Sequence, residues 1–414
     1  MFLISTTTVK YERMKILYIH ALYAPHVAGG AEISLKLLVE AMQTNGHEVA
    51  VLSLSPEEGL SSDWVDGVKV YRAGLRNSYW PFSNERPGKL RRLRWHLRDR
   101  YNRAMAGYVR EVLAAEQPDV VSCHNLVGWS IAVWDEVRRA GIPIVQVLHD
   151  MYLLSPNSTL FKPGYTHPHQ DVMSRLLRHR HRKASSGVAA VIGISRSILD
   201  RFIAYGYFKD VPQYVVHNAR AIPAAGLPRI RGEGDGLTVG FIGTLTAPKG
   251  VEWLICEFKA SGIEGRLRIA GKGKAEDMQY FKQLAGDDSR IDFVGYVAPA
   301  DFYPTIDVLA VPSVWEEPLG MVAVEGLANH LPVVASNRGG LLETVVDGVN
   351  GFHCDPDKPA SLGQALATLW KDVERYNRLA AAARDSVSEY LSVERMVNEY
   401  EQVLRTVRVA DAGI

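Results

Sequence analysis

Short runs of apolar and β-branched residues recur along the whole chain and alternate with longer segments of helical periodicity. In the first half these runs are Ile16–His20, Glu48–Leu54, Val68–Tyr71, Val120–Cys123, Ile144–Leu148, Ala190–Ile194 and Tyr214–Val216. In the second half they are Thr238–Ile242, Leu267–Ala270, Ile291–Val294, Val308–Val311 and Val333–Ala335. Helix-like segments such as Ala31–Thr44 and Ile131–Ala140 lie between most of them. This alternation predicts an α/β protein whose parallel sheets are covered by helices on both faces.

The stretch most typical of a linker runs from Ala221 to Gly236 and is rich in proline and glycine. A chain of 414 residues is long enough for two domains that each bury a core. We therefore expect two Rossmann-like, doubly wound domains that face a cleft, with ligands at the carboxyl ends of the strands. The predicted divisions are an N-terminal extension at 1–13, a first domain at 14–222, a linker at 223–236, a second domain at 237–392 and a final helical segment at 393–414.

Composition narrows the classes of function. The formal net charge of +1 gives no global reason to expect a nucleic-acid partner. The cysteines, Cys123, Cys256 and Cys354, lie far apart, which disfavours both a disulfide framework and a zinc site. No apolar run reaches transmembrane length, and residues 1–13 lack the apolar core of a signal peptide. We therefore expect a cytoplasmic protein.

Two glutamates follow a predicted strand in the second half of the chain. The run Val308–Ser313 is typical of a buried parallel strand, and Pro318 suits the first position of a helix that continues through Leu327. Glu317 would then lie at the turn between strand and helix, and Glu325 about two helical turns further on. Carboxylates beside the exposed N–H groups of a helix start suit a ligand with hydroxyls and phosphate. The alternative is a capping acid and an unrelated surface glutamate.

Other predicted strand ends carry turns suited to anions. Gly29 and Gly30 lie between the first strand and a helix, His149 follows a strand, and a loop runs from Gly243 to Lys249. Glycine in such a turn lets the backbone approach a phosphate at a helix start. The Gly29 turn lacks the Gly-x-Gly-x-x-Gly pattern and the following acid of a dinucleotide site, which disfavours NAD. Taken singly, these features could equally be tight turns, a structural histidine and a solvated lysine.

A longer pattern connects these features. Residues 313–326 read Ser-x-x-Glu-Glu-Pro-Leu-Gly-x-x-x-x-Glu-Gly, and Leu-Pro-Val-Val-Ala-Ser and Gly339-Gly340 follow. The pattern resembles the Glu-x7-Glu signature of retaining glycosyltransferases with the GT-B fold (glycosyl transferases group 1, family 4). The resemblance implies that Glu317 contacts the donor sugar and that Glu325 binds the ribose of the nucleotide. It also implies that backbone amides reach the sugar and the diphosphate; these belong to Leu319, Gly320 and Met321.

The resemblance extends to the loops described above. It implies that His149 touches the donor sugar, with Asp150 orienting its imidazole, and that Lys249 holds the diphosphate. Thr244 stands where many members of the family carry arginine, so Lys249 is expected to be the main cation. The alternative is that Arg220, Lys272 or Lys274 compensates for the missing arginine. His330 replaces a glycine usual near the end of the Glu-x7-Glu helix. The remaining implied donor-binding residues, the last of them beside the base, are Gly29, Gly30, Gly243, Gly271 and Tyr296.

On this basis we predict a retaining, metal-independent glycosyltransferase that moves a sugar from a nucleotide-diphosphate donor, most simply a UDP-sugar, to a glycan or polyprenyl-linked acceptor. No cofactor is expected. Asp355-Pro-Asp357 matches a metal-binding Asp-x-Asp by letters only, and we interpret it as a turn. The resemblance also implies that the final helix crosses back onto the first domain. The alternatives are an epimerase or phosphorylase of the same architecture, or a non-enzymatic protein that binds nucleotide-sugars.

One region has an unusual charge. Residues 86–110 hold nine lysines and arginines against a single acid, Asp99. Leucines recur among them at helical spacing, at Leu90, Leu93 and Leu97. A basic amphipathic helix suits an anionic membrane surface or an anionic acceptor, and the candidate contacts are Arg91, Arg92, Arg94 and Arg98. A second basic block covers 175–183. The alternative is a solvated helix whose leucines face the core.

Overall fold

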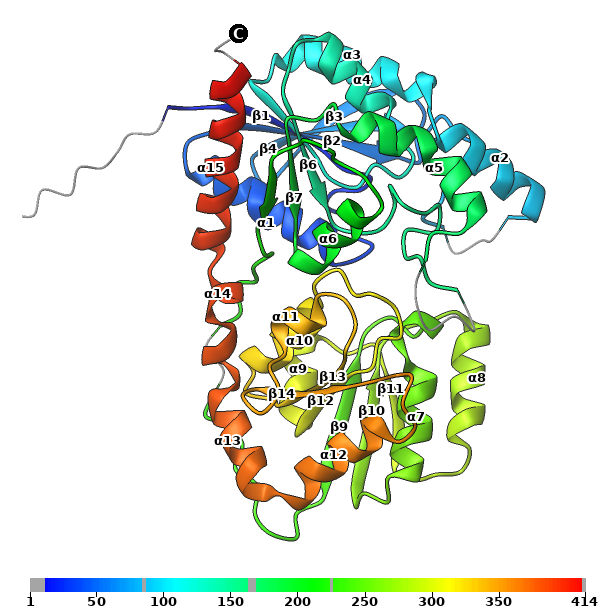
Figure 1. Cartoon of the computed structure of the whole chain (residues 1–414), viewed down its shortest axis with the longest axis vertical. Coiled ribbons are helices and arrows are strands. Elements are labelled where there is room, and N and C mark those ends of the chain that lie inside the picture. The colour runs from blue at the N-terminus through cyan, green and yellow to red at the C-terminus, as the bar shows by residue number, and fades with distance from the viewer. Residues whose placement is uncertain (1–11, 84–86, 163–168, 224–225, 412–414) are drawn as a thin grey trace, which may run out of the picture. The chain divides into compact units, whose positions relative to one another are not determined.

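The computed structural model describes residues 12–83, 87–162, 169–223 and 226–411 of the chain. Within these residues the backbone forms two sheets, and helices connect successive parallel strands (Figure 1). The predicted α/β class with two Rossmann-like sheets is confirmed. Arg86, part of the basic region, and nearly all of the predicted N-terminal extension lie outside the described residues.

The first sheet has the order β3-β4-β2-β1-β5-β6-β7-β8 in the described part of the chain. Its strands are β1 (Lys15–Ile19), β2 (Glu48–Ser55), β3 (Leu60–Val65), β4 (Val68–Gly74), β5 (Val120–Cys123), β6 (Ile144–Leu148), β7 (Ala190–Gly193) and β8 (Gln213–Val215). Its helices are α1 (Gly30–Thr44), α2 (Lys89–Asp99), α3 (Arg103–Glu116), α4 (Ala132–Arg139), α5 (Val172–Ser185) and α6 (Arg196–Ala204). Successive residues of β1 are buried from Ile16 to Ile19, as expected for a strand covered on both faces.

Strand β3 was not predicted. It pairs antiparallel with β4 at the edge of the sheet, with Leu60 opposite Ala73 and Val65 opposite Val68. Its sequence, Leu-Ser-Ser-Asp-Trp-Val, is mostly polar, and its central residues are exposed. An edge strand with little burial needs no apolar run, so the hydrophobic pattern does not reveal it.

The second sheet has the order β11-β10-β9-β12-β13-β14, and its pairs are parallel. Its strands are β9 (Leu237–Ile242), β10 (Gly265–Ala270), β11 (Ile291–Gly295), β12 (Val308–Val311), β13 (Val333–Ser336) and β14 (Gly351–Cys354). The order runs outward from β9 in one direction and from β12 in the other. The strand order therefore reverses between β9 and β12, and ligands of doubly wound sheets bind at the carboxyl ends of such a pair.

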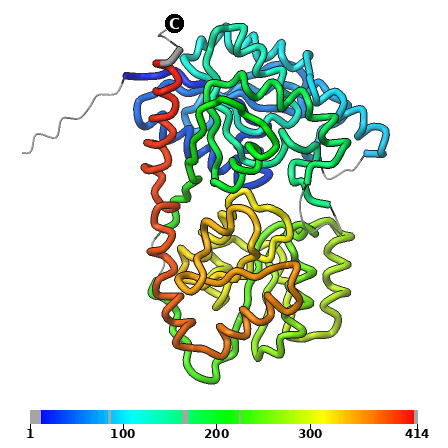
Figure 2. Tube along the Cα trace, viewed as in Figure 1, coloured from blue at the N-terminus to red at the C-terminus, as the bar shows by residue number. Residues whose placement is uncertain are grey.

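The second half of the chain forms helices between and after these strands, and Figure 2 shows its path from green to orange. They are α7 (Val251–Ala260), α8 (Ala275–Ala285), α9 (Pro299–Phe302), α10 (Met321–Ala328), α11 (Leu341–Thr344), α12 (Ser361–Lys371), α13 (Val373–Ala383) and α14 (Ser388–Leu391), with single 3-10 turns at η1 (Ala247–Lys249), η2 (Tyr303–Thr305) and η3 (Asp385–Val387). One core joins Val239 and Leu267 of the sheet to Leu254 of α7, Leu366 of α12 and Leu379 of α13. This core fixes the strand ends from which the site loops leave.

One predicted element boundary is wrong. Pro318 does not begin a helix, because α10 starts at Met321 and Gly320 is its N-cap. Gly320 has a φ of 82°, and a Cβ there would lie 2.4 Å from Cδ2 of Leu341. The chain therefore needs a glycine in the left-handed region before it can enter the helix. Glu317 lies in the loop before α10, and Glu325 lies on the helix itself.

Two compact units divide the described chain. One comprises the described parts of 1–147, 187–190 and 400–414, and the other those of 148–186 and 191–399. Helix α15 (Val393–Asp411) contributes to both units. In the first unit its Glu401 accepts a hydrogen bond from Asn45 Nδ2 at 3.4 Å, and Arg408 lies 3.7 Å from Asp119. No helix in the described part of the chain is long and apolar enough to cross a membrane.

Candidate active site

The loops that follow β9 and β12 pack against each other. Gly250, at the end of the β9 loop, has a φ of 72°, and a Cβ there would lie 1.8 Å from the carbonyl oxygen of Pro312. The amide of Val314 donates to the carbonyl of Pro248 at 2.9 Å. This approach brings Lys249, in η1, to the loop that carries Glu317. The contact lies at the strand pair where the order of the sheet reverses.

Glu317 is buried within a set of donors that all reach one of its oxygens. Lys249 forms an ion pair with Oε1, Ser313 Oγ donates to it at 2.7 Å, and Trp315 Nε1 donates to it at 3.0 Å. The Lys249 ammonium also lies 5.4 Å from the centre of the Trp315 ring. Burial by itself raises the pKa of Glu317, but Lys249 and the hydrogen bonds outweigh it, so the net pKa lies below the ordinary value. Glu317 is therefore ionised at neutral pH.

The backbone of Glu317 is held in place by two glycines that follow β13. Gly340 donates its amide to the carbonyl of Glu317 at 2.7 Å. Gly339 has a φ of 59°, and a Cβ there would lie 2.2 Å from the same carbonyl oxygen. Ser336 Oγ donates to the carbonyl of Ser313 at 2.5 Å. The Gly339-Gly340 pair of the sequence pattern thus shapes the loop that presents Glu317.

Glu325 lies in a different setting, on α10. Tyr303 donates its hydroxyl to Oε2 at 3.0 Å, and Arg220 Nε lies 3.7 Å from Oε1. Burial raises the pKa of Glu325, and Arg220 and Tyr303 only partly oppose this effect. Leu319 is buried beside the helix start, while Gly320 and Met321 supply the first backbone groups of α10. Unpaired amides at such a start suit an anion.

The loops after β10 and β11 complete this edge of the sheet. Gly271 has a φ of 140°, and a Cβ there would lie 1.8 Å from the carbonyl oxygen of Gly243. Gly271 also donates its amide to Gly295 at 2.7 Å. Tyr296 is 70% exposed, and the Lys272 ammonium lies 4.7 Å from the centre of its ring. Thr244 is exposed in the loop after β9.

The remaining predicted residues belong to the first sheet. His149 directly follows β6 and is buried, while the Asp150 carboxylate accepts from the amide of Tyr152 at 2.8 Å. Gly29 is the N-cap of α1, and its amide donates to Glu32 Oε2 at 2.8 Å. A side chain at position 32 therefore caps the helix that Gly30 begins. The turn Gly29-Gly30-Ala31-Glu32 thus has a structural role at the start of α1.

Glu32 also faces a buried histidine. His20 Nδ1 lies 3.9 Å from Glu32 Oε1 and accepts from the amide of Leu22 at 3.0 Å. Burial lowers the pKa of His20 to about 4, so the imidazole is neutral near pH 7. The close pair is therefore not an ion pair at neutral pH.

Several site partners could not be identified from the sequence pattern alone. Trp315 and Ser313 lie within the motif stretch, but Tyr303 and Arg220 are distant in sequence from Glu325. Ser313 carried a signal as the first fixed position of the motif, whereas Trp315 occupies one of its variable positions. Folding of the sheet brings the other partners to the glutamates.

The Asp355–Asp357 pair has a different partner. Arg338 lies 2.6 Å from Asp357 and 3.8 Å from Asp355, so this arginine holds both carboxylates in a turn after β14. In the described part of the chain, histidine, cysteine, aspartate and glutamate form no group of three or more that could hold a metal ion.

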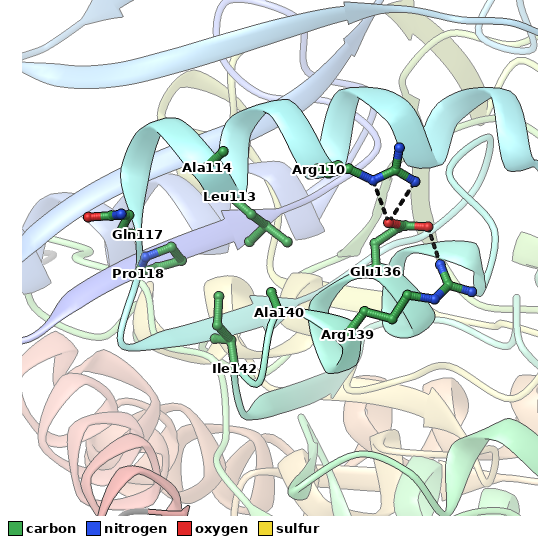
Figure 3. Close-up of a pocket in the computed structure, with 9 residues that line it drawn as sticks. All are labelled: Arg110, Leu113, Ala114, Gln117, Pro118, Glu136, Arg139, Ala140 and Ile142. Atoms are coloured by element: carbon green, nitrogen blue, oxygen red, sulfur yellow. Dashed lines mark hydrogen bonds and ion pairs between the residues drawn. The ribbon is translucent and has the colours of Figure 1, made fainter.

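A separate cavity of about 510 Å³ lies between α3 and α4 (Figure 3). Leu113 and Ile142 form part of its apolar wall, and Arg110 and Arg139 both bind Glu136 at its rim. The predicted sugar-binding residues lie on other elements.

Solved structures share this architecture. A sucrose-phosphate synthase from Thermosynechococcus elongatus aligns with a TM-score of 0.76 and 19% identity, over 96% of this chain and 100% of that chain. Anabaena Alr3699/HepE, solved in complex with UDP and glucose, aligns with a TM-score of 0.70 and 21% identity, over 95% and 100% of the two chains. The fold and the paired strand-end loops define a protein of the GT-B class.

The family follows from sequence comparison. Residues 236–372 match Glycosyl transferases group 1, and residues 28–220 match Glycosyltransferase Family 4. An uncharacterized 42.6 kDa protein in the cps region of Klebsiella pneumoniae is 30% identical over 330 residues, which are 80% of this chain and 87% of that protein. The chain belongs to the group 1, family 4 glycosyltransferases.

Proposed function

We propose that this glycosyltransferase transfers a sugar from a UDP-sugar donor to a glycan or polyprenyl-linked acceptor with retention of anomeric configuration. The observation that carries the proposal is the buried contact between Lys249 and Glu317, at the carboxyl ends of β9 and β12. A nucleotide-sugar needs a cation for its diphosphate and an ionised acceptor for its sugar hydroxyls. These two groups meet at the strand pair where a doubly wound sheet binds its ligand.

The donor would be held by both glutamates. Glu317 has its pKa lowered, so it stays ionised and can accept hydrogen bonds from the hydroxyls of the donor sugar. Glu325, on the helix α10 that follows this loop, would accept hydrogen bonds from the ribose hydroxyls. The amides of Leu319, Gly320 and Met321 would bind the sugar and the diphosphate. UDP is chosen as the nucleotide because Alr3699/HepE is solved with UDP and glucose.

The chemistry would rest on the departing diphosphate. The acceptor hydroxyl attacks the anomeric carbon on the face from which the diphosphate leaves, and the phosphate oxygen takes the hydroxyl proton. The new glycosidic bond thus replaces the sugar–phosphate bond with the same configuration. Lys249 and the amides around Gly243 and Gly271 would stabilise the charge that builds on the phosphate. His149 would contact the sugar, and this scheme assigns no step to a metal ion.

Lys249 must change partners for this scheme to operate. In the structure Lys249 pairs with Glu317, so it would have to turn its ammonium from that carboxylate toward the diphosphate of a bound donor. The ring of Trp315 gives the ammonium a further favourable contact in either position.

The proposal is tested by the product itself. Purified protein is given UDP-glucose and candidate acceptors, and proton NMR of the product reads the anomeric configuration. An α-linked product from the α-linked donor supports the proposal, and a β-linked product contradicts it. Binding of UDP-glucose without transfer or hydrolysis would favour a binding protein instead. We further propose a cytoplasmic location, which fractionation of cells would test.

A further inference from the structure

Helix α2 presents its leucines outward. Leu90 is 85% exposed, Leu93 is 47% exposed and Leu97 is 50% exposed. Their spacing of three and four residues places them in one row along the helix. The alternative considered from the sequence, in which these leucines face the core, is therefore wrong.

The opposite face of α2 fixes this orientation. Trp95 is buried, and its Nε1 donates to the carbonyl of Tyr79 at 3.1 Å. Asp99 is also buried, and its carboxylate accepts from the amide of Gly128 at 2.9 Å. An aromatic ring and a paired carboxylate thus hold the helix against the body, so the leucine row cannot turn inward without breaking both contacts.

Basic residues accompany the leucine row. Arg91, Arg94 and Arg98 are exposed and follow one side of it on a helix of regular pitch. Asp99, the acid of α2, lies on the buried face. The guanidinium of Arg91 donates to the carbonyl of Ser78 at 2.8 Å, which keeps this charge beside the helix. The outward face of α2 is therefore apolar along its middle and positive along its edge.

Helix α5, considered by itself, has the same inverted pattern. Val172 is 80% exposed, Met173 is 57% exposed and Leu176 is 64% exposed. The exposed basic residues Arg180 and Lys183 continue this face toward the end of the helix. An outward apolar row with flanking arginine and lysine thus occurs twice.

We infer that α2 is an interfacial helix that docks on an anionic bilayer, inserting Leu90, Leu93 and Leu97 among the acyl chains. Arg94 and Arg98 would bind lipid phosphates at the level of the head groups, because arginine forms paired hydrogen bonds with phosphate oxygens. The apolar row and the positive edge together match a bilayer surface, in which an apolar layer of acyl chains lies beneath a layer of anionic head groups. Helix α5 carries a surface of the same kind in the other unit, and it is tested by itself. This inference does not depend on the donor chemistry.

The first test measures binding of the full-length protein to vesicles. Vesicles of phosphatidylcholine with 30% phosphatidylglycerol are compared with pure phosphatidylcholine by sedimentation. We expect binding to the anionic vesicles, and loss of about tenfold or more in the partition constant when Leu90, Leu93 and Leu97 are replaced by serine. Replacing Arg91, Arg92, Arg94 and Arg98 by serine should reduce binding as strongly. A triple Val172, Met173 and Leu176 to serine variant tests α5 separately.

A charge-matched control separates local from global attraction. Four basic residues of the other unit are exposed: Arg266 on β10, Lys282 on α8, Arg378 on α13 and Lys358 in the turn after β14. Replacing these four by serine removes the same charge as the arginine variant and should leave binding unchanged. Thermal unfolding followed by circular dichroism checks that each variant is folded.

The second test detects insertion directly. Of the described cysteines, Cys123 and Cys354 are buried and Cys256 is exposed. In a Cys256→Ser background, Leu93→Cys carries an environment-sensitive nitrobenzoxadiazole label. Insertion predicts a blue shift on anionic vesicles and quenching by brominated acyl chains.

Three outcomes would overturn the inference. In the first the native protein does not bind anionic vesicles at low salt, and in the second the leucine variant binds as well as the parental protein. In the third outcome the labelled Leu93→Cys protein binds the vesicles without a blue shift. The last two would show that α2 meets only a charged surface, as an anionic soluble acceptor would provide. Transfer or hydrolysis assays with soluble donor report on the proposed function separately, so failure of one proposal is distinguishable from failure of the other.

Discussion

Glu317 lies in the loop 312–320 and Glu325 lies on the helix α10, and the two carboxylates experience opposite electrostatic settings. Both are largely removed from water, which by itself raises a carboxyl pKa. Around Glu317, a lysine and two neutral donors reach a single oxygen, and its pKa falls. Around Glu325, an arginine at 3.7 Å and one hydroxyl do not offset burial, and its pKa rises.

This difference in pKa indicates different roles for Glu317 and Glu325. Glu317 is a fixed anion whose partners are already in place before any ligand arrives. Glu325 is a carboxylate with incomplete compensation, so additional donors would stabilise its charged form. Ribose hydroxyls are such donors. We therefore expect the loop to govern turnover and the helix to govern donor affinity.

The largest expected effect follows from removing the cation of the loop. Lys249→Ala should lower the turnover number on the order of a hundredfold, because charge builds on the departing diphosphate in the transition state. Steady-state kinetics with UDP-glucose measure it. The exposed Lys358→Ala variant removes a lysine elsewhere and should keep the parental rate. An unchanged turnover number in Lys249→Ala would contradict the role of this lysine.

Removing each glutamate sharpens the comparison directly. Glu325→Ala should weaken UDP-glucose binding by roughly 1.5–3 kcal/mol, because the ribose loses an ionised acceptor. Glu317→Ala should lower the turnover number by at least as large a factor as Glu325→Ala lowers the affinity, because the Glu317 carboxylate would contact the reacting sugar. Isothermal titration and kinetics on both variants separate the two effects. If both variants transfer sugar at the parental rate, the assignment of this motif is wrong.

The opposite pKa shifts predict opposite dependences of stability on pH. The folded pKa of Glu317 lies below its unfolded value, so its stabilisation is present above the unfolded pKa and is lost as pH falls through the folded pKa. The folded pKa of Glu325 lies above its unfolded value, so its contribution to stability declines as pH rises through that range.

Urea unfolding of Glu317→Gln and Glu325→Gln from pH 4 to pH 8 reads these contributions. At pH 7 we expect Glu317→Gln to lower the free energy of unfolding by about 1–3 kcal/mol, reduced by the access of Lys249 to water. Glu325→Gln should change it less, and its effect should become more favourable as pH rises. Parallel pH profiles in the two variants would contradict the comparison.

Much of the architecture could be predicted from the hydrophobic pattern, because buried parallel strands such as Val120–Cys123 and Val308–Val311 are continuous apolar runs. The edge strand β3 was not predicted, because little of it is buried and it therefore needs no apolar run. The start of α10 was misplaced because proline at a helix start is common, whereas here a left-handed Gly320 sets the entry. The contact of Lys249 with Glu317 depends on strand order, which local periodicity does not specify. The domain limits at 14–222 and 237–392 stay predictions.

The smallest expected effect concerns metal ions, where the comparison predicts no change. A divalent cation at the diphosphate would need ionised carboxylates beside it. Glu317 already receives Lys249, Ser313 and Trp315 on one oxygen, and the two oxygens of Glu325 already face Tyr303 and Arg220. Lys249 would instead supply the positive charge that the leaving group requires. The rate of transfer in excess EDTA should therefore equal the rate without it. A rate that falls in EDTA and recovers with added Mn²⁺ would show that transfer requires a metal ion. The roles assigned to Lys249 and Glu317 would then be wrong.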